Sequence, residues 1–312
     1  MKSKGTKEVI VIGAVNMDIG AMAQGALVAR DSNIGTVTTS FGGVGRNIAH
    51  NLCLLGVDTG MVTVLGDDGF AAELRRHAAT IGLDMSRCAT ISGEHTSTYL
   101  YIADRDGDMA LAVNDMDIYR HVTPDFLAQR LDAINSARLL VVDTNLPQES
   151  IAWLCEHTDV PIVVDPVSTV KAEKLTGLLG KLYAIKPNRM EAEVLSGVTI
   201  REEADITRAA QVLLDKGVQQ VYLSLSTEGI YAADRAGDTV RLPCPQVRAV
   251  NATGCGDAMV AALSAGILWG RSLRENAALA MAAGAFTATS KSAIHPEMSA
   301  KNIEILMEKE KI

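Results

Sequence analysis

The amino-acid sequence predicts a three-layer α/β fold, in which a mainly parallel sheet carries helices on both faces. Short runs of β-branched and aliphatic residues alternate with segments whose apolar residues recur at helical spacing. The first run is Val9 to Ile12, and Gly13 closes it. Parallel strands need a crossover between them, so this alternation is typical of a parallel sheet covered on both sides.

Later segments repeat the pattern along most of the chain. Residues 48–55 have helical spacing and stop at Gly56, a residue type common just past a helix C-terminus. The C-terminal third is rich in alanine and predicted to be helical. We expect further strands at 139–142, 161–164 and 220–223, and helices at 148–156, 206–216, 258–269 and 273–289.

Two regions depart from the alternation and predict a small separate β sheet. Residues 36–41 alternate in polarity, and so do 98–103 and 109–113, which flank a turn-rich segment at 104–108. Such alternation predicts one dry face and one solvated face. No proline-rich or serine-rich linker is visible. We therefore expect one domain over residues 1–312, with a β lid from about 14–42 and 96–115.

Composition limits the classes of partner and compartment. The 312 residues are 48% apolar, enough for a large core, and 29 basic against 37 acidic residues give a net charge of −8. Sequence-independent nucleic-acid binding needs a basic face, so we expect no nucleic-acid partner. We expect no membrane partner either, because no apolar run is long enough to span one. Five scattered cysteines without a CxxC pair fit a reducing cytoplasm.

A glycine pair precedes the first predicted helix. Gly42 and Gly43 allow close backbone approach and positive φ, and Asn47 offers a donor and an acceptor to a hydroxyl. Taken alone, this segment favours a tight turn with a helix cap.

A second glycine-rich segment, residues 251–257, leads into another predicted helix. Gly254 and Gly256 expose backbone N–H groups at the positive end of the helix dipole, which suits a phosphoryl group. Asp257 lies in the first turn, where it either stabilises the helix or acts as a general base. This segment alone does not decide between the two.

Together, these motifs about two hundred residues apart resemble the ribokinase-like (pfkB) carbohydrate kinases. The resemblance covers essentially the whole chain. Residues 13–18 match the family's first-strand motif, 186–191 its Asn-x-x-Glu motif, and 225–229 its nucleotide-binding turn. The first family signature is met by Gly42, Gly43, Asn47, Ala49, Gly56 and Gly66. A ribokinase-like fold and ATP-dependent phosphorylation are the expectations that follow.

The resemblance also implies residue roles. Asp257 is expected to take the proton from the substrate hydroxyl, while Gly254, Cys255 and Gly256 present N–H groups to the phosphoryl group. ATP and Mg²⁺ are the implied cofactors, with Asn188 and Glu191 acting on the metal indirectly. Residues implied to contact ATP are Asn188, Ser224, Ser226, Gly229, Gly254 and Gly256, with 283–293 closing the adenine side. Residues implied to hold sugar hydroxyls are Asp18, Gly42, Gly43 and Asn47.

Some residues depart from the family pattern. Asn251 and Ala252 replace the usual Asp and Thr in a loop that, with residues 291–294, holds a monovalent cation in many relatives. Loss of that carboxylate puts K⁺ activation in doubt. Cys255 replaces Ala or Ser, and a thiol at a helix N-terminus is expected to have a lowered pKa. Sensitivity to oxidation or alkylation is one hypothesis for Cys255, and a tolerated small residue is the other.

Further segments are similar to the pseudouridine kinases of this family. They include residues 31–35, 42–49, 113–118 and 165–168. On this basis Ser32, Asn33 and Asn114 are candidates for binding the substrate. Lys171 can donate to a uracil carbonyl from a strand end, or can be an ordinary surface lysine.

Several alternatives stay open at the level of sequence. The chain can be another sugar or nucleoside kinase of the family, acting on ribose, uridine or adenosine. It can also be a non-catalytic nucleoside-binding protein on the same fold. Relatives often pair through the lid, so a homodimer is expected, as an exposed sheet favours association.

Overall fold

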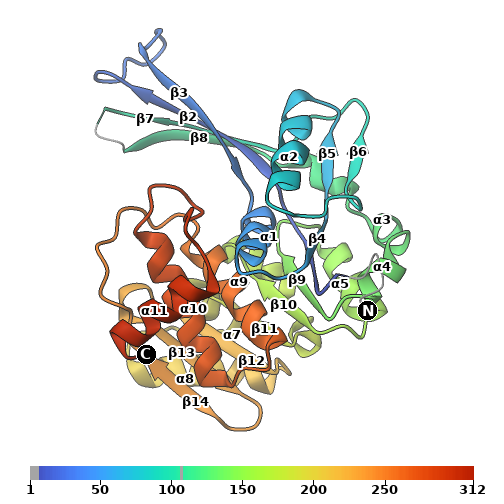
Figure 1. Cartoon of the computed structure of the whole chain (residues 1–312), viewed down its shortest axis with the longest axis vertical. Helices are drawn as coiled ribbons and strands as arrows, with labels where there is room; N and C mark the ends of the chain where they lie inside the picture. The colour runs from blue at the N-terminus through green and yellow to red at the C-terminus, as the bar shows by residue number, and fades with distance from the viewer. Residues whose placement is uncertain (1–6, 106–107) are drawn as a thin grey trace.

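The computed structural model describes residues 7–105 and 108–312. Its largest element is an eight-stranded sheet in the order β14-β13-β12-β11-β10-β9-β1-β4 (Figure 1). All pairs from β4 to β12 are parallel, as expected, whereas β13 and β14 add an antiparallel edge that the sequence analysis did not predict. The strands are β1 (Val9–Ile12), β4 (Thr59–Val62), β9 (Leu139–Asp143), β10 (Ile162–Asp165), β11 (Ala184–Ile185), β12 (Gln220–Ser224), β13 (Ile230–Asp234) and β14 (Thr239–Leu242).

Strand β1 shows how the sheet separates two cores. All four of its residues are fully buried. Val9 and Val11 contribute to one hydrophobic cluster, whereas Ile10 and Ile12 contribute to the other. Successive side chains of a strand point to opposite faces, so a continuous apolar run fits a sheet covered on both sides.

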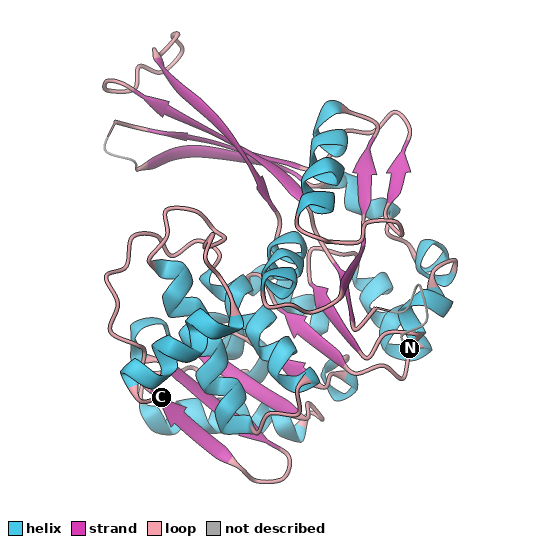
Figure 2. Ribbon diagram, viewed as in Figure 1, coloured by secondary structure: helices cyan, strands magenta, loops and turns pink. Residues whose placement is uncertain are grey.

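Helices form the two outer layers (Figure 2). The layer that includes the C-terminal helices contains α1 (Val44–Leu54), α2 (Gly69–Thr80), α9 (Cys255–Leu268), α10 (Leu273–Ala288) and α11 (Ala300–Glu310). The opposite layer contains α3 (Pro124–Ala128), α4 (Leu131–Asn135), α5 (Gln148–His157), α6 (Thr169–Ala172), α7 (Arg189–Ser196) and α8 (Glu203–Asp215). Short 3₁₀ turns are η1 (Asp117–His121), η2 (Glu173–Leu175), η3 (Leu179–Lys181) and η4 (Ser226–Glu228).

Three helices begin before the residue at which apolar spacing predicts them, and α8 is one of these, starting at Glu203 rather than at residue 206. Helix α1 begins at Val44 rather than at residue 48, and α9 begins at Cys255 rather than at residue 258. In both cases a glycine with positive φ, Gly43 or Gly254, immediately precedes the helix. Apolar periodicity does not register a first turn that faces a cleft instead of the core. No helix in the described residues is long and apolar enough to cross a membrane.

A second sheet of four strands extends away from the α/β body (Figures 1 and 2). Its order is β3 (Gly35–Gly42), β2 (Asn16–Ala23), β7 (Thr98–Ala103) and β8 (Met109–Asp115). The antiparallel pairing of β7 with β8 agrees with the expected hairpin, although Asp106 and Gly107 of its turn lie outside the described residues. Strand β2, which the sequence analysis did not identify, pairs with both β3 and β7. Strands β5 (Val64–Gly66) and β6 (Ala89–Ile91) form a separate pair.

The expected dry face of this small sheet is solvent-exposed within the chain. Pairing register places Val37, Leu111 and Val113 on one face of the sheet, which we call the outer face. Their exposed fractions are 69%, 58% and 58%. The opposite, inner face carries Asp18 and Asn114 in register with Tyr99.

Candidate active site

Helix α9 starts at a glycine that no other residue type can replace without rearrangement. Gly254 has φ of 81°, and a Cβ atom added there would lie 2.0 Å from the carbonyl oxygen of Ala293. The loop after α10 therefore presses directly on the helix N-terminus. Asp257 follows in the first turn, at the positive end of the helix.

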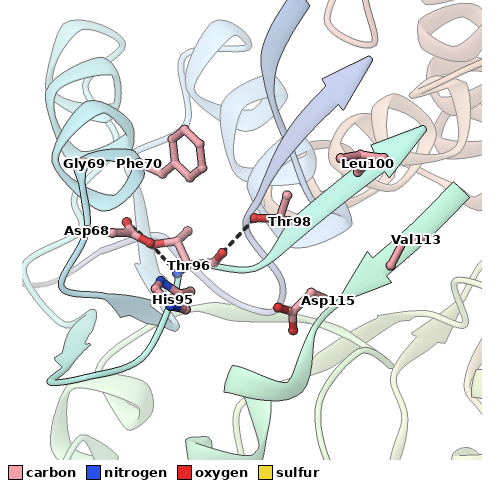
Figure 3. Close-up of a pocket in the computed structure, with 9 residues that line it drawn as sticks. All are labelled: Asp68, Gly69, Phe70, His95, Thr96, Thr98, Leu100, Val113 and Asp115. Atoms are coloured by element: carbon pink, nitrogen blue, oxygen red, sulfur yellow. Dashed lines mark hydrogen bonds between the residues drawn. The ribbon is translucent and has the colours of Figure 1, made fainter. Parts of the chain in front are cut away.

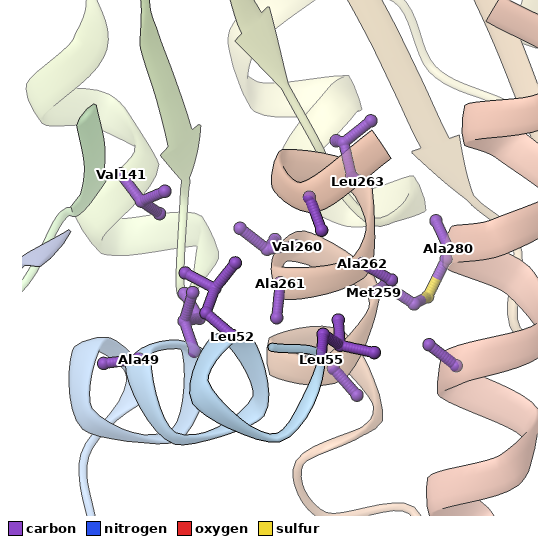
Figure 4. Close-up of a cluster of buried hydrophobic side chains, with 14 of the residues drawn as sticks. Ala49, Leu52, Leu55, Val141, Met259, Val260, Ala261, Ala262, Leu263 and Ala280 are labelled. Carbon is purple, nitrogen blue, oxygen red and sulfur yellow. The ribbon is translucent and has the colours of Figure 1, made fainter. Parts of the chain in front are cut away.

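Asp257 meets Asn47, a residue of α1, across the fold. The Asn47 Nδ2 atom donates to Asp257 Oδ2 at 2.8 Å. Helices α1 and α9 pack through small and aliphatic residues that include Ala49, Leu52 and Ala261 (Figure 4). This packing fixes the separation of the two polar groups, so the structure brings both glycine-rich motifs to one site.

The surroundings of Asp257 favour its protonated form. Burial raises its pKa from 3.8 to about 7, with a further increase from nearby Asp165. The Asn47 hydrogen bond and the charge of Lys186 act in the opposite direction. A carboxyl group with a pKa near neutrality can both accept and release a proton at physiological pH.

Two buried acids terminate neighbouring strands beside this group. Asp143 ends β9 and Asp165 ends β10, and Lys186 Nζ lies 3.8 Å from Asp165. Asp143 accepts from the backbone N–H groups of Ala14 and Asn145, both at 2.8 Å, and burial raises its pKa. No role is predicted for Asp143 from the sequence. An acid directly after a buried apolar run was the available signal, since ligand sites gather at the carboxyl ends of parallel strands.

The glycine pair brings the β3–α1 junction close to the loop after β1. Gly43 has φ of 93°, and a Cβ there would lie 2.5 Å from the carbonyl oxygen of Ala14. A Cβ at Gly42 would lie 2.1 Å from Asp18 Oδ2. The missing side chain of Gly42 therefore makes room for the Asp18 carboxylate. Burial raises the pKa of Asp18 to about 6, against the lowering effect of Arg46.

The Asn-x-x-Glu motif forms a capping box at the start of α7. Asn188 Oδ1 accepts from the Glu191 backbone N–H, and Glu191 Oε2 accepts from the Asn188 backbone N–H, both at 2.9 Å. Glu191 is 3% exposed, and burial raises its pKa. The backbone of Asn188 forms an isolated parallel β-bridge with Ser224 at the end of β12. Ser226 and Gly229, with φ of 56° and 99°, form the turn that follows.

Between the small sheet and the body lies a cleft of about 940 Å³. Its lining includes Asp18, Arg46, Tyr99 and Tyr101, together with body residues 251, 253 and 291–294. The inner face of the sheet therefore lies over the loops next to α9. Of the residues predicted to bind substrate or to catalyse, Asp18 lines this space, whereas Asp257, Asn47, Asn114 and Lys171 are not among its lining residues.

A second cavity of about 570 Å³ lies on the outer face of the small sheet, beside α2 (Figure 3). Leu100, Val113 and Phe70 contribute apolar surface to it. Its Asp68 carboxylate is engaged structurally, because it accepts from Thr96 N and Oγ1 at 2.7 and 2.8 Å and caps α2. None of the sequence-predicted site residues lines this cavity.

Ser32 and Asn33 lie apart from the cleft. They belong to the exposed loop joining β2 and β3, at the far end of the small sheet (Figure 1). The Asn33 side chain is used within its own loop, accepting from Val28 N at 2.8 Å and donating to Val28 O and Asp31 O. In this structure neither residue lines the cleft around Asp18.

Lys171 is partly buried rather than an ordinary surface lysine. It lies in α6, and its Nζ atom donates to Asn145 Oδ1 and approaches Met116 Sδ at 3.7 Å. Burial lowers its pKa, while nearby Asp143 acts in the opposite direction. Lys171 therefore lies beside the carboxyl end of β9, close to the acids that surround Asp257.

Two departures from the family pattern acquire a structural explanation. Asn251 Nδ2 donates to the carbonyl oxygen of Lys291 at 3.0 Å, so a neutral amide links the two loops. For Cys255, the expected lowering of the thiol pKa is wrong. Burial first, and then Asp257, raise that pKa to about 11. Desolvation and a neighbouring carboxylate outweigh the helix N-terminus.

A family model described as "pfkB family carbohydrate kinase" matches residues 6–300. The chain belongs to the pfkB family of carbohydrate kinases. It is therefore an ATP-dependent kinase, as the motifs predicted. The ribokinase-like α/β fold is confirmed as well: Arabidopsis thaliana ribokinase complexed with ribose and ATP matches with a TM-score of 0.85, covering 97% of this chain and 99% of that one. At 22% identity this likeness concerns the fold alone.

Two other proteins are more similar to this chain in sequence. Pseudouridine kinase of Escherichia coli strain K12 is 33% identical over 301 residues, which cover 96% of each chain. An uncharacterized sugar kinase of the same strain is 37% identical over 294 residues, covering 94% of this chain and 81% of the relative. Similarity to these two proteins over nearly the whole of this chain supports a sugar or nucleoside as the phosphoryl acceptor.

Proposed function

We propose that this kinase transfers the γ-phosphoryl group of ATP to the 5′-hydroxyl of pseudouridine, with Asp257 as the general base. The observation that carries the mechanism is the position of Asp257, hydrogen-bonded to Asn47 in the first turn of α9. The similarity to pseudouridine kinase over nearly the whole chain supports the choice of substrate.

The proposed reaction is an in-line displacement. Asp257 takes the proton of the 5′-hydroxyl as that oxygen bonds to the γ-phosphorus, and the bond from phosphorus to the ADP oxygen breaks. Backbone N–H groups of Gly254, Cys255 and Gly256 would stabilise charge on the transferring group. Asp18 and Asn47, with the open backbone at Gly42 and Gly43, would hold the ribose hydroxyls in position.

ATP is proposed to lie beside Asn188, Ser224 and the turn containing Ser226 and Gly229, with residues 283–293 at its adenine side. The bridge between Asn188 and Ser224 supports this placement, because it joins the capped helix to the turn after β12. Mg²⁺ would neutralise phosphate charge and bind largely through ATP oxygens and water. One Glu191 oxygen is used in the capping box, which fits an indirect action of Glu191 and Asn188 on the metal.

Base recognition is proposed to involve Lys171 and Asn114. Lys171 is held by Asn145 near the acid cluster, and Asn114 shares the inner face of the small sheet with Asp18. Contribution from Ser32 and Asn33 would require their loop to reach a cleft that it does not line here. Turnover of uridine, adenosine or ribose remains the alternative within the family, and a non-catalytic nucleoside-binding protein is the alternative outside it.

We further propose that residues 1–312 form one kinase domain, whose four-stranded sheet is a lid spanning about residues 14–42 and 96–115. Closure of this lid would exclude water from the phosphoryl group. The exposed apolar outer face, with Val37, Leu111 and Val113, supports a homodimer formed through the lids. Leu111→Asp is expected to give a monomer by light scattering. Five free thiols support a cytoplasmic location.

The decisive experiment compares acceptors in Mg²⁺-ATP turnover, read as ADP formation. Pseudouridine, uridine, adenosine, ribose and fructose are assayed in parallel, with Asp257→Asn as the control. Preference for pseudouridine that disappears in the control supports substrate and mechanism together. Preference for another acceptor refutes pseudouridine and keeps the mechanism, whereas tight nucleoside binding without any turnover favours the binding-protein alternative.

A further inference from the structure

Arg46 is a buried charge that the proposed reaction leaves without a role. It lies in the first turn of α1 and is 6% exposed. A buried guanidinium is costly unless its donors are paired. Arg46 Nη1 donates to the carbonyl oxygen of Phe41 and to Asn47 Oδ1, both at 3.0 Å. Its Nη2 atom lies 3.1 Å from His50 Nδ1.

The bond to Asn47 determines which way that amide faces. The two ends of an asparagine amide have nearly the same shape, and only their hydrogen-bond partners distinguish them. Because a guanidinium has donors only, the atom facing Arg46 must be Oδ1. The Nδ2 group then faces Asp257, where it donates at 2.8 Å. The reversed amide would place two acceptors against each other at Asp257 and two donors against each other at Arg46.

The charge of Arg46 acts on the same site. Asp18 from β2 and Asp257 from α9 are its acidic neighbours, and both interact favourably with its positive charge. Burial lowers the pKa of Arg46 to about 10, so the group stays protonated at neutral pH. Among the other charged groups near Asp257, Asp143 and Asp165 raise its pKa and Lys186 lowers it. The Cys255 thiol lies two residues before Asp257 in the first turn of α9.

Two histidines complete the surroundings of Arg46, and burial lowers the pKa of both. Burial and Arg46 lower the pKa of His50 to about 3, so its Nδ1 atom is free to accept from the guanidinium. His77 from α2 packs against Phe41 with ring centroids 4.7 Å apart and the ring planes tilted by 42°, and burial lowers its pKa as well. Glu73 of α2 lines the same cleft as Arg46. Arg46 is therefore held on one side by neutral acceptors and acts on the acids at the other.

We propose that Arg46 is a positioning residue for phosphoryl transfer, because it holds the Asn47 amide in the single orientation that donates to Asp257. This inference rests on the proposed function, in which Asp257 is the general base. The order of contacts is His50, Arg46, Asn47 and Asp257, with Phe41 O as the second anchor of the guanidinium.

The test measures the pH dependence of kcat in Arg46→Met, Arg46→Lys and wild type. The acidic limb, the low-pH side of the kcat profile where Asp257 becomes protonated, is expected to move up by about one pH unit in Arg46→Met. The reason is that the Asp257 carboxylate loses an oriented donor and a nearby positive charge. At a pH below both midpoints, kcat of Arg46→Met is then about tenfold lower than kcat of wild type. The KM for ATP is expected to stay unchanged. Arg46→Lys keeps the charge without the fork of donors and is expected to restore part of the limb position.

Arg75→Met is the matched control. Arg75 also donates to two carbonyl oxygens, those of Met85 and Cys88, but it lies in α2 outside the proposed site. Its loss is expected to lower stability and to leave the limb in place. A limb in Arg46→Met that coincides with wild type would overturn the inference, as would an equal shift in Arg75→Met.

A second pair of variants serves if Arg46→Met does not fold. His50→Gln keeps an acceptor for Arg46 Nη2, whereas His50→Leu leaves that donor unpaired. We expect the acidic limb of the kcat profile to move in His50→Leu and not in His50→Gln. The same limb position in both variants would count against the series of contacts from His50 to Asp257. The carboxyl ¹³C resonance of Asp257, assigned by its absence in Asp257→Asn, gives the same pKa comparison without substrate.

The outcomes separate this inference from the proposed function. Near-normal turnover in Asp257→Asn removes the general base and refutes the proposed mechanism. An inactive Asp257→Asn together with an unmoved limb and an unmoved carboxyl resonance in Arg46→Met refutes only the role of Arg46.

Discussion

Replacement of Asp257 by Asn is predicted to abolish turnover and to stabilise the folded protein above neutral pH. The loss of a general base lowers kcat by about 10²–10⁴. The folded carboxyl has a pKa of about 7 against 3.8 for the ordinary group. It therefore binds its proton more tightly when folded, and folding loses stability as the pH rises from 3.8 to about 7.

The size of this stability effect follows from the same shift. About three pH units correspond to roughly 4 kcal/mol, which is an upper bound because Asp257 is partly exposed. At pH 5 just over a third of the cost is present, and above pH 7 all of it is. We therefore expect Asp257→Asn to gain about 2 kcal/mol more over wild type at pH 8 than at pH 5.

Urea unfolding of both proteins at pH 5 and pH 8 measures the gain, and ADP formation measures kcat. The exposed Asp125→Asn is the control for a general effect of removing a carboxylate. An advantage of Asp257→Asn that is the same at both pH values would refute the burial argument. A kcat within a few-fold of wild type would refute the assignment of the base.

Four further outcomes are expected. Lys171→Met should raise KM for the nucleoside about tenfold and spare KM for ATP, since it removes a charged donor; steady-state kinetics showing the reverse would exclude it from base recognition. Gly254→Ala should lose kcat and unfold at a lower temperature, because its Cβ would meet Ala293 O at 2.0 Å and φ is 81°; a wild-type melting temperature contradicts this. Turnover should be equal in KCl and tetramethylammonium chloride, because the Asn251 amide already bridges to Lys291 O, and Asn251→Asp should introduce a cation dependence; strong K⁺ activation of wild type would oppose this reasoning. Iodoacetamide at pH 7 should modify Cys255 slowly, since burial raises its pKa to about 11, and rapid loss of activity prevented by ATP would show a reactive thiol.

The central sheet was predictable because its strands are buried on both faces. The run of β1 is apolar throughout and that of β9 is apolar up to its terminal Asp143, so tertiary packing agrees with local preference there. Strand β2 escaped prediction because it carries Asp18 and glycine between apolar residues. Its polar positions face a cleft rather than open solvent, so its composition resembles that of a loop. The antiparallel edge of β13 and β14 depends on pairing that no local pattern specifies.

The site was predictable only in part. Family resemblance, and not local chemistry, connected Asn47 with Asp257 across 210 positions, and the structure places them in hydrogen-bond contact. Arg46 gave no signal, because an arginine in a first helical turn is ordinarily exposed and its burial depends on β2 and α9 folding over it. The thiol pKa of Cys255 was predicted in the wrong direction, because a general rule for helix N-termini omits desolvation at this particular helix.

The small sheet and the helices of the body differ in how deeply their residues are buried, and this difference bears on how the enzyme can evolve. Asn114, proposed to contact the acceptor, lies on β8, which like β3 of the same small sheet is almost entirely exposed. Substitutions there disturb few buried contacts, so acceptor preference can drift at little cost to folding. Asp257 and Asn47 instead lie on helices packed into the core, where most replacements are purged. Under the roles proposed above, a lineage built this way can explore new acceptors while its phosphoryl-transfer chemistry stays fixed.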